Sequence, residues 1–289
     1  MHDFSGPSPD SSHAPDLRPI RLRRTVRVGL RLLGRSGAEP SAQRTKRSNG
    51  YAGIPPSDGW TAHHEIDVEC VGAPDPVTGY LVGIQEIDAA VRERAVPLME
   101  RLAHEAPDDP AQVPGKIAAA VSEAPALRHA RVTALTWRPG PFVSHTWSDT
   151  MPDAALLAER FEFSAAHRLH CPQLSDEENR RTFGKCNHPS GHGHNYRVEV
   201  AVRVPTGPGA APMTAAALEA IVLREVIDRF DHRHLNADCP EFASLNPSVE
   251  NIARVCHGLL EGPVRAGGAA LHRVTVWETE KTSATFPAA

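Results

Sequence analysis

The sequence has no long apolar run, no excess of positive charge and no recognisable leader pattern. No stretch approaches the roughly 18 consecutive apolar residues of a membrane-spanning helix. The first residues, MHDFSGPSPD, lack the charged-then-apolar order of a secretory signal. Lys and Arg number 31 against 35 Asp and Glu, and the net charge of −4 gives no overall attraction for nucleic acid. We therefore expect a cytoplasmic protein with no nucleic-acid or membrane partner.

The five cysteines also lack the spacing of a disulfide framework. They are odd in number, widely spread and without a Cys-x-x-Cys pair, which argues against stapling disulfides and against a four-cysteine zinc site. Histidine is abundant at 16 residues, crowded between His167 and His194 and again between His232 and His234. Because imidazole titrates near neutral pH and binds metals, we expect the chemistry in these two segments.

The length of 289 residues allows two domains, because chains divide into units of roughly 100 to 200 residues. Residues 1–17 are rich in Pro, Ser and Asp, with little to bury, so we predict a disordered tail. Apolar periodicity predicts two modules, 18–150 and 155–289, each with strands before and after two helices. Matching segments lie about 130 to 140 residues apart, which indicates a tandem duplication.

The elements expected in the two modules follow the same order. The first module has apolar residues at helical spacing over 84–102, where Pro97 should kink or divide the helix. The second has a helix over 215–230 and another that starts with Asn246 as N-cap and Pro247 in first position. The strands are predicted at 26–33, 66–70 and 130–137, then at 160–165, 198–204 and 273–278.

Seven arginines and no acids fall between Arg18 and Arg35, a segment that contains the first predicted strand. The simplest interpretation is an arginine-flanked strand with a solvated face. A strip that binds phosphate or contacts another subunit is the alternative.

Three histidines have the spacing of a metal site. On a strand, His192 and His194 point to the same side about 7 Å apart along the chain, close enough to share one ion. His167, at the end of the preceding strand, can supply a third imidazole. Three neutral imidazoles leave a fourth position open, as in catalytic zinc sites. Two alternatives remain: histidines of a polar surface loop, or a structural zinc knuckle made with Cys171 and Cys186.

Cys186 is the candidate reactive thiol. Lys185 precedes it and the expected zinc site follows six residues later, and nearby positive charge lowers the pKa of a thiol. A thiolate at this position can act as base or nucleophile. The alternative is an inert buried cysteine.

Two acids have neighbours that suggest function. Asp231 abuts His232, and a carboxylate that orients an imidazole can relay a proton. Glu278 ends the last strand on the face of Val274 and Val276, so its carboxylate must reach solvent or meet a specific donor. A heterocycle that presents two adjacent N–H groups is such a donor.

Six segments in order, FSAAH, FGKC, GHGHNY, DHRHLN, PSVEN and VWETE, resemble the 6-pyruvoyl-tetrahydropterin synthase family, which also contains 6-carboxy-tetrahydropterin synthases. The resemblance covers about residues 158–286. It implies an α+β T-fold, in which an antiparallel four-stranded sheet carries two helices on one face and subunits assemble into a barrel. By the same resemblance, the zinc ligands are His167, His192 and His194, the proton-transfer residues are Cys186, Asp231 and His232, and the substrate-binding residues are Glu278, Glu250 and Ser248.

The resemblance implies a Zn²⁺-dependent lyase of tetrahydrobiopterin biosynthesis. Its substrate is 7,8-dihydroneopterin triphosphate, and its products are 6-pyruvoyl-tetrahydropterin and triphosphate. Five residues separate Cys186 from His192, as in the pyruvoyl-forming branch. His188, Ser190 and His234 depart from the family pattern and leave the product open. The alternatives are a 6-carboxy-tetrahydropterin synthase of the queuosine (deazapurine) pathway, or an inactive scaffold that binds zinc or pterin.

The first module resembles a degenerate T-fold. Trp60 and Ala62 are predicted to stand where His192 and His194 stand in the second module, and Thr136 where Glu278 stands. We expect this module to bind neither zinc nor pterin and to serve assembly as a homo-oligomer, a trimer of tandem chains or another multiple. It would also offer basic residues to the triphosphate.

Overall fold

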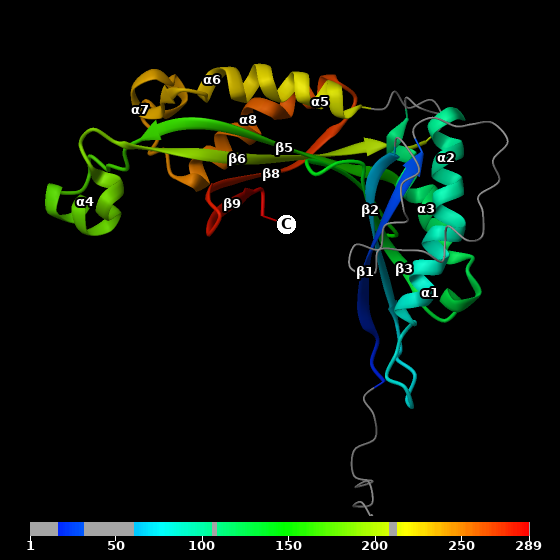
Figure 1. The fold of residues 1–289 in the computed structure, drawn as a ribbon. Coiled ribbons are helices and arrows are strands. Elements are labelled where there is room, and N and C mark those ends of the chain that lie inside the picture. Colours follow the sequence, from blue (N-terminus) through cyan, green and yellow to red (C-terminus); the bar gives the residue numbers. More distant parts are fainter. Residues whose placement is uncertain (1–16, 32–60, 106–108, 208–212, 289) are drawn as a thin grey trace, which may run out of the picture.

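The computed structural model describes residues 17–31, 61–105, 109–207 and 213–288. The predicted disordered tail lies, apart from Leu17, outside the described residues. Within them, eight strands follow one antiparallel path in the order β1-β2-β3-β4-β5-β6-β8-β9, and β7 pairs in parallel with β5. The predicted α+β class with an antiparallel sheet is confirmed (Figure 1). The strands are β1 (Ile20–Arg31), β2 (Thr61–Gly72), β3 (Arg131–Arg138), β4 (Val143–Ser148), β5 (Met151–His167), β6 (His192–Pro205), β7 (Arg233–His234), β8 (Ala270–Thr279) and β9 (Thr282–Phe286).

The helices fall into two groups along the sheet. In Figure 1, α1 to α3 cover one side of β1–β3, and α5, α6 and α8 lie along β5, β6 and β8. The first group is α1 (Ile84–Ala90), η1 (Val91–Ala95), α2 (Val96–Glu105), η2 (Pro110–Gln112), α3 (Val113–Ser122) and η3 (Pro125–Leu127). The second is α4 (Asp176–Phe183), η4 (Gly184–Asn187), α5 (Ala215–Val222), η5 (Leu223–Ile227), α6 (Asp228–Phe230), α7 (Leu235–Asp238), η6 (Pro240–Phe242) and α8 (Val249–Ala266).

Each group of helices closes its own hydrophobic core. Alternate residues of the strands face the helices, as the period of two requires. Ile66 and Val68 of β2 are fully buried in the first core, and Val198 and Val200 of β6 in the second. The apolar residues Val249, Ile252 and Ala253 of α8 are buried in the second core.

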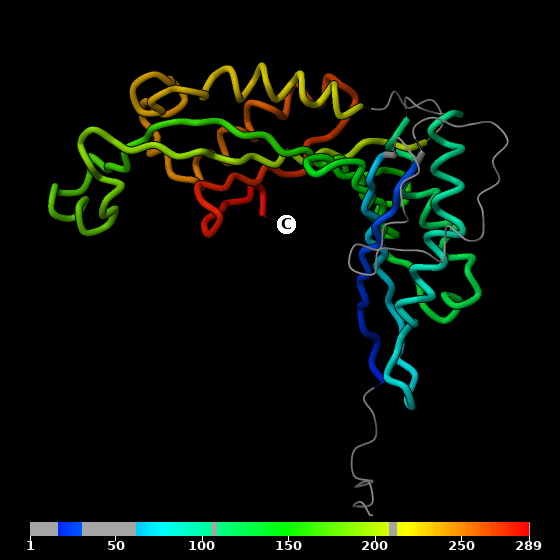
Figure 2. The backbone as a smooth tube through the Cα atoms, in the orientation of Figure 1, coloured from blue at the N-terminus to red at the C-terminus, as the bar shows by residue number. Residues whose placement is uncertain are grey.

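The two halves share one continuous sheet through the β4–β5 hairpin. The start of β5 pairs with β4 on one side, and nearly all of β5 pairs with β6 on the other. β5 has 17 residues, so at about 3.3 Å per residue it is on the order of 50 Å long. Figure 2 shows β5 and β6 running side by side from the first half to the far end, where α4 lies. That far end is where His167 closes β5.

Small irregularities recur at matching places in the two halves. A register shift interrupts β2 at Glu69/Cys70 and β6 at Ala201/Val202. Thr136 bonds to Thr146 across β3 and β4 at 2.9 Å, and Thr275 bonds to Thr285 across β8 and β9 at 2.8 Å. These features are what a tandem duplication would leave, although the duplication itself remains a prediction.

A π-helical turn interrupts the first long helix of each half. In η1 the Val96 N–H donates to Val91 O, and in η5 the Asp228 N–H donates to Leu223 O. Pro97 is the second residue of α2, with one residue between it and η1, so the π-helical turn lies next to the proline at which a kink or division is predicted. The turn in the second half has no proline, which indicates that the π turn accommodates Pro97 rather than resulting from it.

One predicted helix cap is wrong. Ser248, not Asn246, is the N-cap of α8, and its side chain accepts a hydrogen bond from the Asn251 N–H. Both residues are good caps. Asn246 instead uses its side-chain oxygen to accept from the His170 N–H, which ties the loop before α8 to the loop after β5.

Candidate active site

The ends of two paired strands bring the three predicted histidines together. His167, the last residue of β5, pairs with His192, the first residue of β6, and His194 follows on the same face. Gly191 makes this approach possible. Its φ is +68°, and a Cβ there would lie 2.7 Å from His167 O and 2.8 Å from His234 Nε2, so only glycine fits the turn into β6.

A fourth side chain joins the histidines. The Nε2 atoms of His167 and His192 are 3.3 Å apart. Glu278 Oε1, at the end of β8, lies 3.3 Å from His167 Nε2 and 3.3 Å from His194 Nε2. One ligand atom from each of the four residues falls within 4.8 Å of the others. The sequence predicts that the Glu278 carboxylate reaches solvent or meets a specific donor. In the structure its partners are the histidines.

The tautomer of His167 follows from its contact with the chain before α8. His167 is fully buried, and its Nδ1 lies 2.7 Å from Pro247 O. A carbonyl oxygen can only accept, so Nδ1 carries a proton and donates it. In the neutral ring the lone pair is then on Nε2, which faces the cluster.

The charges of the cluster favour neutral imidazoles at His192 and His194 and a carboxylate at Glu278. Burial lowers the pKa of His192, and the neighbouring His167 lowers it further. Burial also lowers the pKa of His194, against the opposing effect of Glu278. The contact with His167 holds the pKa of Glu278 below its usual value despite burial. Metal ligands must be deprotonated, so these directions suit a cation site.

The donor set fits a zinc ion. The buried atom His194 Nε2 has no hydrogen-bond partner among the described residues. A tetrahedral ion with bonds of about 2.0–2.1 Å holds its ligand atoms about 3.3 Å apart, the separation found for three of the contacts in the cluster. Imidazole and carboxylate are both ordinary zinc ligands. The interpretation as surface-loop histidines does not account for this convergence.

The structure joins Asp231 and His232 as predicted. Asp231 Oδ2 is 2.7 Å from His232 Nδ1, while Asp231 Oδ1 accepts from the Ser164 N–H at 2.8 Å. These two contacts lower the pKa of Asp231, the Ser164 N–H first. His232 has a φ of +58°, and its side chain is 83% exposed. The pair is therefore anchored to β5 at the carboxylate and open to solvent at the imidazole.

Cys186 lies in η4, after the capping-box helix α4, and its carbonyl accepts from the Leu169 N–H at 2.8 Å. The protein groups alone do not give the lowered thiol pKa that the sequence predicted. Burial, and then the negative charge of Glu278, raise the pKa of the Cys186 thiol. The sequence could not reveal this cause, because Glu278 is distant along the chain.

The remaining predicted substrate residues lie at the start of α8. Ser248 caps the helix, and Glu250 is exposed in its first turn. Pro247, directly before them, is the residue whose carbonyl holds His167. This end of α8 is therefore adjacent to the histidine cluster, while the binding roles of Ser248 and Glu250 remain predictions.

Sequence reasoning missed Tyr196. Its side chain is fully buried, its ring centroid lies 5.5 Å from that of His194, and its hydroxyl has no partner among the described residues. Burial, Glu278 and Cys186 all raise its pKa, so it remains a neutral donor. The spacing of His192, His194 and Tyr196, every second residue of one strand, is the signal that could have identified it.

The matching positions in the first half differ from the cluster. Ala62 faces Leu30 as His194 faces Ala165, so Ala62 stands in the predicted place. The predicted match of Thr136 to Glu278 is wrong. Thr136 of β3 pairs with Asp67 of β2, and Thr275 of β8 pairs with Glu199 at the matching position of β6, so Thr136 corresponds to Thr275. Trp60 lies outside the described residues.

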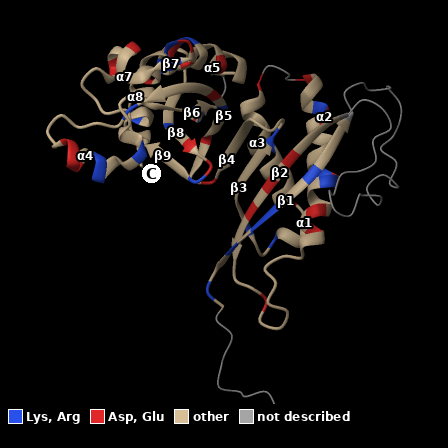
Figure 3. Ribbon diagram, turned by 60° about the vertical axis from the view of Figure 1, so that its left-hand side comes forward, with Lys and Arg blue, Asp and Glu red and all other residues tan. Residues whose placement is uncertain are grey.

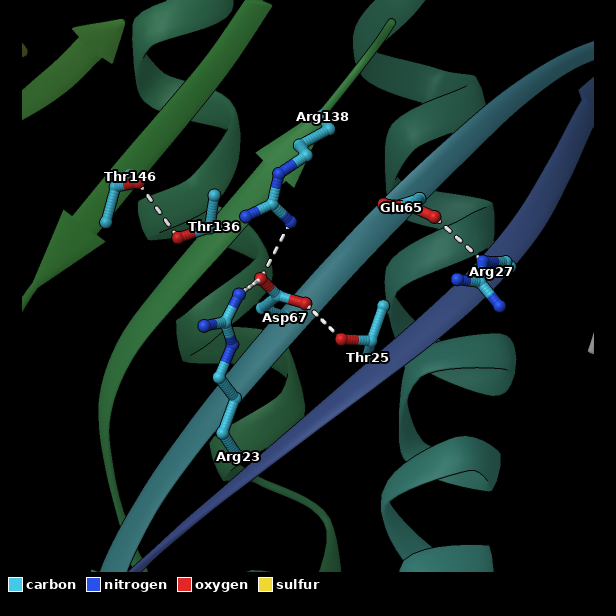
Figure 4. A network of polar contacts seen from close by, with 8 residues as sticks. All are labelled: Arg23, Thr25, Arg27, Glu65, Asp67, Thr136, Arg138 and Thr146. Carbon is cyan, nitrogen blue, oxygen red and sulfur yellow. Dashed lines mark hydrogen bonds and ion pairs between the residues drawn. The ribbon is translucent and has the colours of Figure 1, made fainter. Parts of the chain in front are cut away.

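The arginine-rich strand of the first half is paired with acids. Figure 3 shows the basic residues of β1 beside the acidic residues of β2. Buried Asp67 contacts Arg23, accepts from Arg138 at 2.7 Å and accepts from Thr25 at 2.5 Å (Figure 4). The other described pairs are Arg21–Glu69, Arg27–Glu65 and Arg24–Asp88. The interpretation as a solvated, arginine-flanked strand agrees with these contacts better than a phosphate strip does.

None of the helices in the described part of the chain combines the length and the apolar character that crossing a membrane requires.

Comparison with known proteins matches residues 156–289 to a family model described as 6-pyruvoyl tetrahydropterin synthase. The 6-pyruvoyl tetrahydrobiopterin synthase of Homo sapiens is 39% identical over 127 residues, which are 44% of this chain and 86% of the human protein. That of Drosophila melanogaster is 46% identical over 104 residues, 34% of this chain and 60% of the fly protein. The solved Caenorhabditis elegans 6-pyruvoyl tetrahydropterin synthase is 35% identical, with a TM-score of 0.41 over 47% of this chain and 96% of that chain.

Proposed function

The chain belongs to the 6-pyruvoyl tetrahydropterin synthase family through its second half, and we propose that residues 155–289 form a zinc-dependent lyase. The substrate would be 7,8-dihydroneopterin triphosphate, and the products 6-pyruvoyl-tetrahydropterin and triphosphate. Triphosphate leaves by elimination, and the side chain is oxidised at the expense of the pterin ring, so no nicotinamide is needed. The observation that carries the proposal is the convergence of His167, His192 and His194 in the matched segment.

Two observations support the pyruvoyl product over a carboxy product. The curated relatives compared above carry the name 6-pyruvoyl tetrahydrobiopterin synthase. Five residues lie between Cys186 and His192, the spacing expected of the pyruvoyl-forming branch.

The histidines His167, His192 and His194 would hold the zinc ion. When bound, zinc would supply a positive charge that makes the hydroxyl groups of the substrate side chain easier to deprotonate. The Pro247 carbonyl fixes the ring of His167, which keeps Nε2 directed at the site.

Proton transfer would fall to Cys186 and to the Asp231–His232 pair. Cys186 would take a proton from the substrate side chain. Asp231 holds His232 at Nδ1, which leaves Nε2 of this exposed ring as the group that exchanges protons with solvent. The Ser164 N–H keeps the Asp231 carboxylate in place. Ser248 and Glu250, at the start of α8 beside His167, would contact the pterin.

The first half would serve assembly as a homo-oligomer. Among the described strands, β1 pairs only with β2 and β9 only with β8, so each end of the sheet presents an unpaired edge that another chain can extend. A trimer of tandem chains, or another multiple, would close such sheets into a barrel. The site lies at the far end of β5, so any basic residue that the first half lends to the triphosphate would come from another copy.

A mass-spectrometric assay of the zinc-loaded protein with 7,8-dihydroneopterin triphosphate tests the proposal. We expect triphosphate and a pyruvoyl pterin, with turnover lost in Cys186→Ala and retained in Cys239→Ala, which alters a thiol of the second core. A carboxy pterin would replace the proposed product. No turnover by folded, zinc-loaded protein would contradict the lyase and leave a binding scaffold.

A further inference from the structure

Glu278 is placed to do more than bind a substrate. The β6–β8 register pairs Arg197 with Trp277, so Glu278 lies across from Tyr196, two residues along from His194. Its carboxylate turns toward the histidines rather than away from them, and its side chain is only 18% exposed. The carboxylate is therefore part of the cluster through its position on the strand.

A neutral His167 ring cannot donate a hydrogen bond to this carboxylate. With Nδ1 of His167 donating to Pro247 O, the Nε2 of the neutral ring presents a lone pair to Glu278 Oε1 at 3.3 Å. A carboxylate oxygen is also only an acceptor. His192 Nε2 lies 3.3 Å from the same His167 atom. These nitrogen and oxygen atoms, which are the usual ligand atoms of metal ions, therefore face one another at distances where one cation can bind them all.

We propose that Glu278 is a fourth ligand to the ion that the three histidines hold, and that it closes the metal site until substrate displaces it. The proposal rests on the proposed function, because it assumes that His167, His192 and His194 bind zinc. It adds that the resting site is four-coordinate through protein atoms alone. The substrate must then compete with a side chain of this chain for the fourth position.

This arrangement has two physical consequences. A carboxylate reduces the net charge of the site from +2 to +1 and adds a ligand, so the resting protein should hold its metal more tightly than three imidazoles alone would. The same carboxylate must leave before a substrate oxygen can bind. Removing it should therefore weaken metal binding and, at saturating metal, ease entry of a ligand to the open position.

Cobalt titration of the metal-free, full-length protein tests the proposal without measuring activity. Co²⁺ in a tetrahedral site absorbs visible light in a way that depends on the number and type of its ligands. We expect Glu278→Gln and Glu278→Ala to weaken Co²⁺ binding by about 10- to 100-fold and to change the visible spectrum. The matched control is Glu280→Gln, in the turn that follows β8, where the side chain is 90% exposed; it should match the wild type.

A second arm uses azide, a small anion that binds open metal positions. We expect azide to change the spectrum of Co²⁺-loaded Glu278→Ala at lower concentration than that of the wild type. Equal Co²⁺ affinity, spectrum and azide response in wild type and both Glu278 variants would overturn the proposal. If the wild type itself binds no Co²⁺, the zinc-dependent function fails first, so the two failures are distinguishable. Circular dichroism shows whether each variant is folded.

Discussion

The two halves of the chain have the same arrangement of strands and helices but differ in the side chains that this arrangement brings together. In the second half, the ends of β5, β6 and β8 bring His167, His194 and Glu278 into contact. In the first half, Ala62 stands in the place of His194. Trp137, which corresponds to Val276, stacks between His64 and His145 at centroid distances of 5.9 and 5.3 Å. The comparison teaches that the fold positions a site but does not create one.

The two halves also differ in the side chains on the face of the sheet that points away from the helices. The first half carries a buried carboxylate, Asp67, between two arginines. On the open face of the second, Glu199 pairs with Arg160 at 2.8 Å, and its side chain is 16% exposed. Ion pairs therefore link the strands of both halves, while the proposed metal site lies in the second half alone.

The largest expected effect comes from removing a histidine of the second half. His192→Ala should reduce turnover of 7,8-dihydroneopterin triphosphate by about a thousandfold or more, because it removes one of three proposed metal ligands. Steady-state kinetics measure this. The control is His63→Ala, an exposed histidine of β2, which should leave turnover unchanged. Equal losses in both variants would contradict the difference between the halves.

The next effect is a dependence of stability on pH that originates in the first half. Burial lowers the pKa of His145 to about 4, from an ordinary value of 6.5. Between these pH values the unfolded chain binds a proton that the folded protein does not, so stability falls as pH drops from 6.5 toward 4, by up to about 3 kcal/mol.

Urea unfolding followed by tryptophan fluorescence measures this dependence, since Trp137 and Trp147 both pack against the first core. His145→Gln should remove most of the slope between pH 6.5 and 4. A slope that persists unchanged in that variant would assign the effect to other groups, such as His64, whose pKa burial also lowers. Burial raises the pKa of Glu159 to about 7, and its contribution runs in the opposite direction, with stability lost as pH rises from 4.5 to 7.

A smaller effect is expected from Asp67. Asp67→Asn leaves Arg23 and Arg138 without a carboxylate, and should lower the free energy of unfolding by about 1–3 kcal/mol, since the acid is buried but the arginines are partly solvated. The matched change Glu69→Gln breaks a more exposed pair with Arg21 and should cost less than about 1 kcal/mol. Equal costs would show that burial of Asp67 does not matter.

The smallest effect is expected from Tyr196. Its hydroxyl is buried without a partner among the described residues, so Tyr196→Phe should change the free energy of unfolding by less than about 1 kcal/mol. Thermal unfolding measures it. A loss of several kcal/mol would reveal a hydrogen bond that Tyr196 makes in solution.

The sequence predicted most of the second half because its signals are local. His192 and His194 share a face through strand geometry alone, and Asp231 is adjacent to His232. The strands β4 and β9 were not identified individually, because they are short and mix small polar residues with few apolar ones, as in TSATF. Apolar periodicity is weak in such segments.

What the sequence could not predict depends on contacts between distant segments. The place of Glu278 in the cluster requires the β6–β8 register, and the orientation of His167 requires the Pro247 carbonyl, 80 residues away. The raised pKa of Cys186 arises from burial and from Glu278. The mistaken match of Thr136 to Glu278 also arises from contacts between distant segments. The register shifts in β2 and β6 can be located only from the pairing of these strands with β3 and β8.

The number of zinc ions bound per chain tests the central claim most directly. The metal-free protein is reconstituted with zinc, dialysed and analysed by inductively coupled plasma mass spectrometry against protein concentration. Our account predicts one zinc ion per chain, held by the second half alone. Two ions per chain, or none in folded protein, would contradict it.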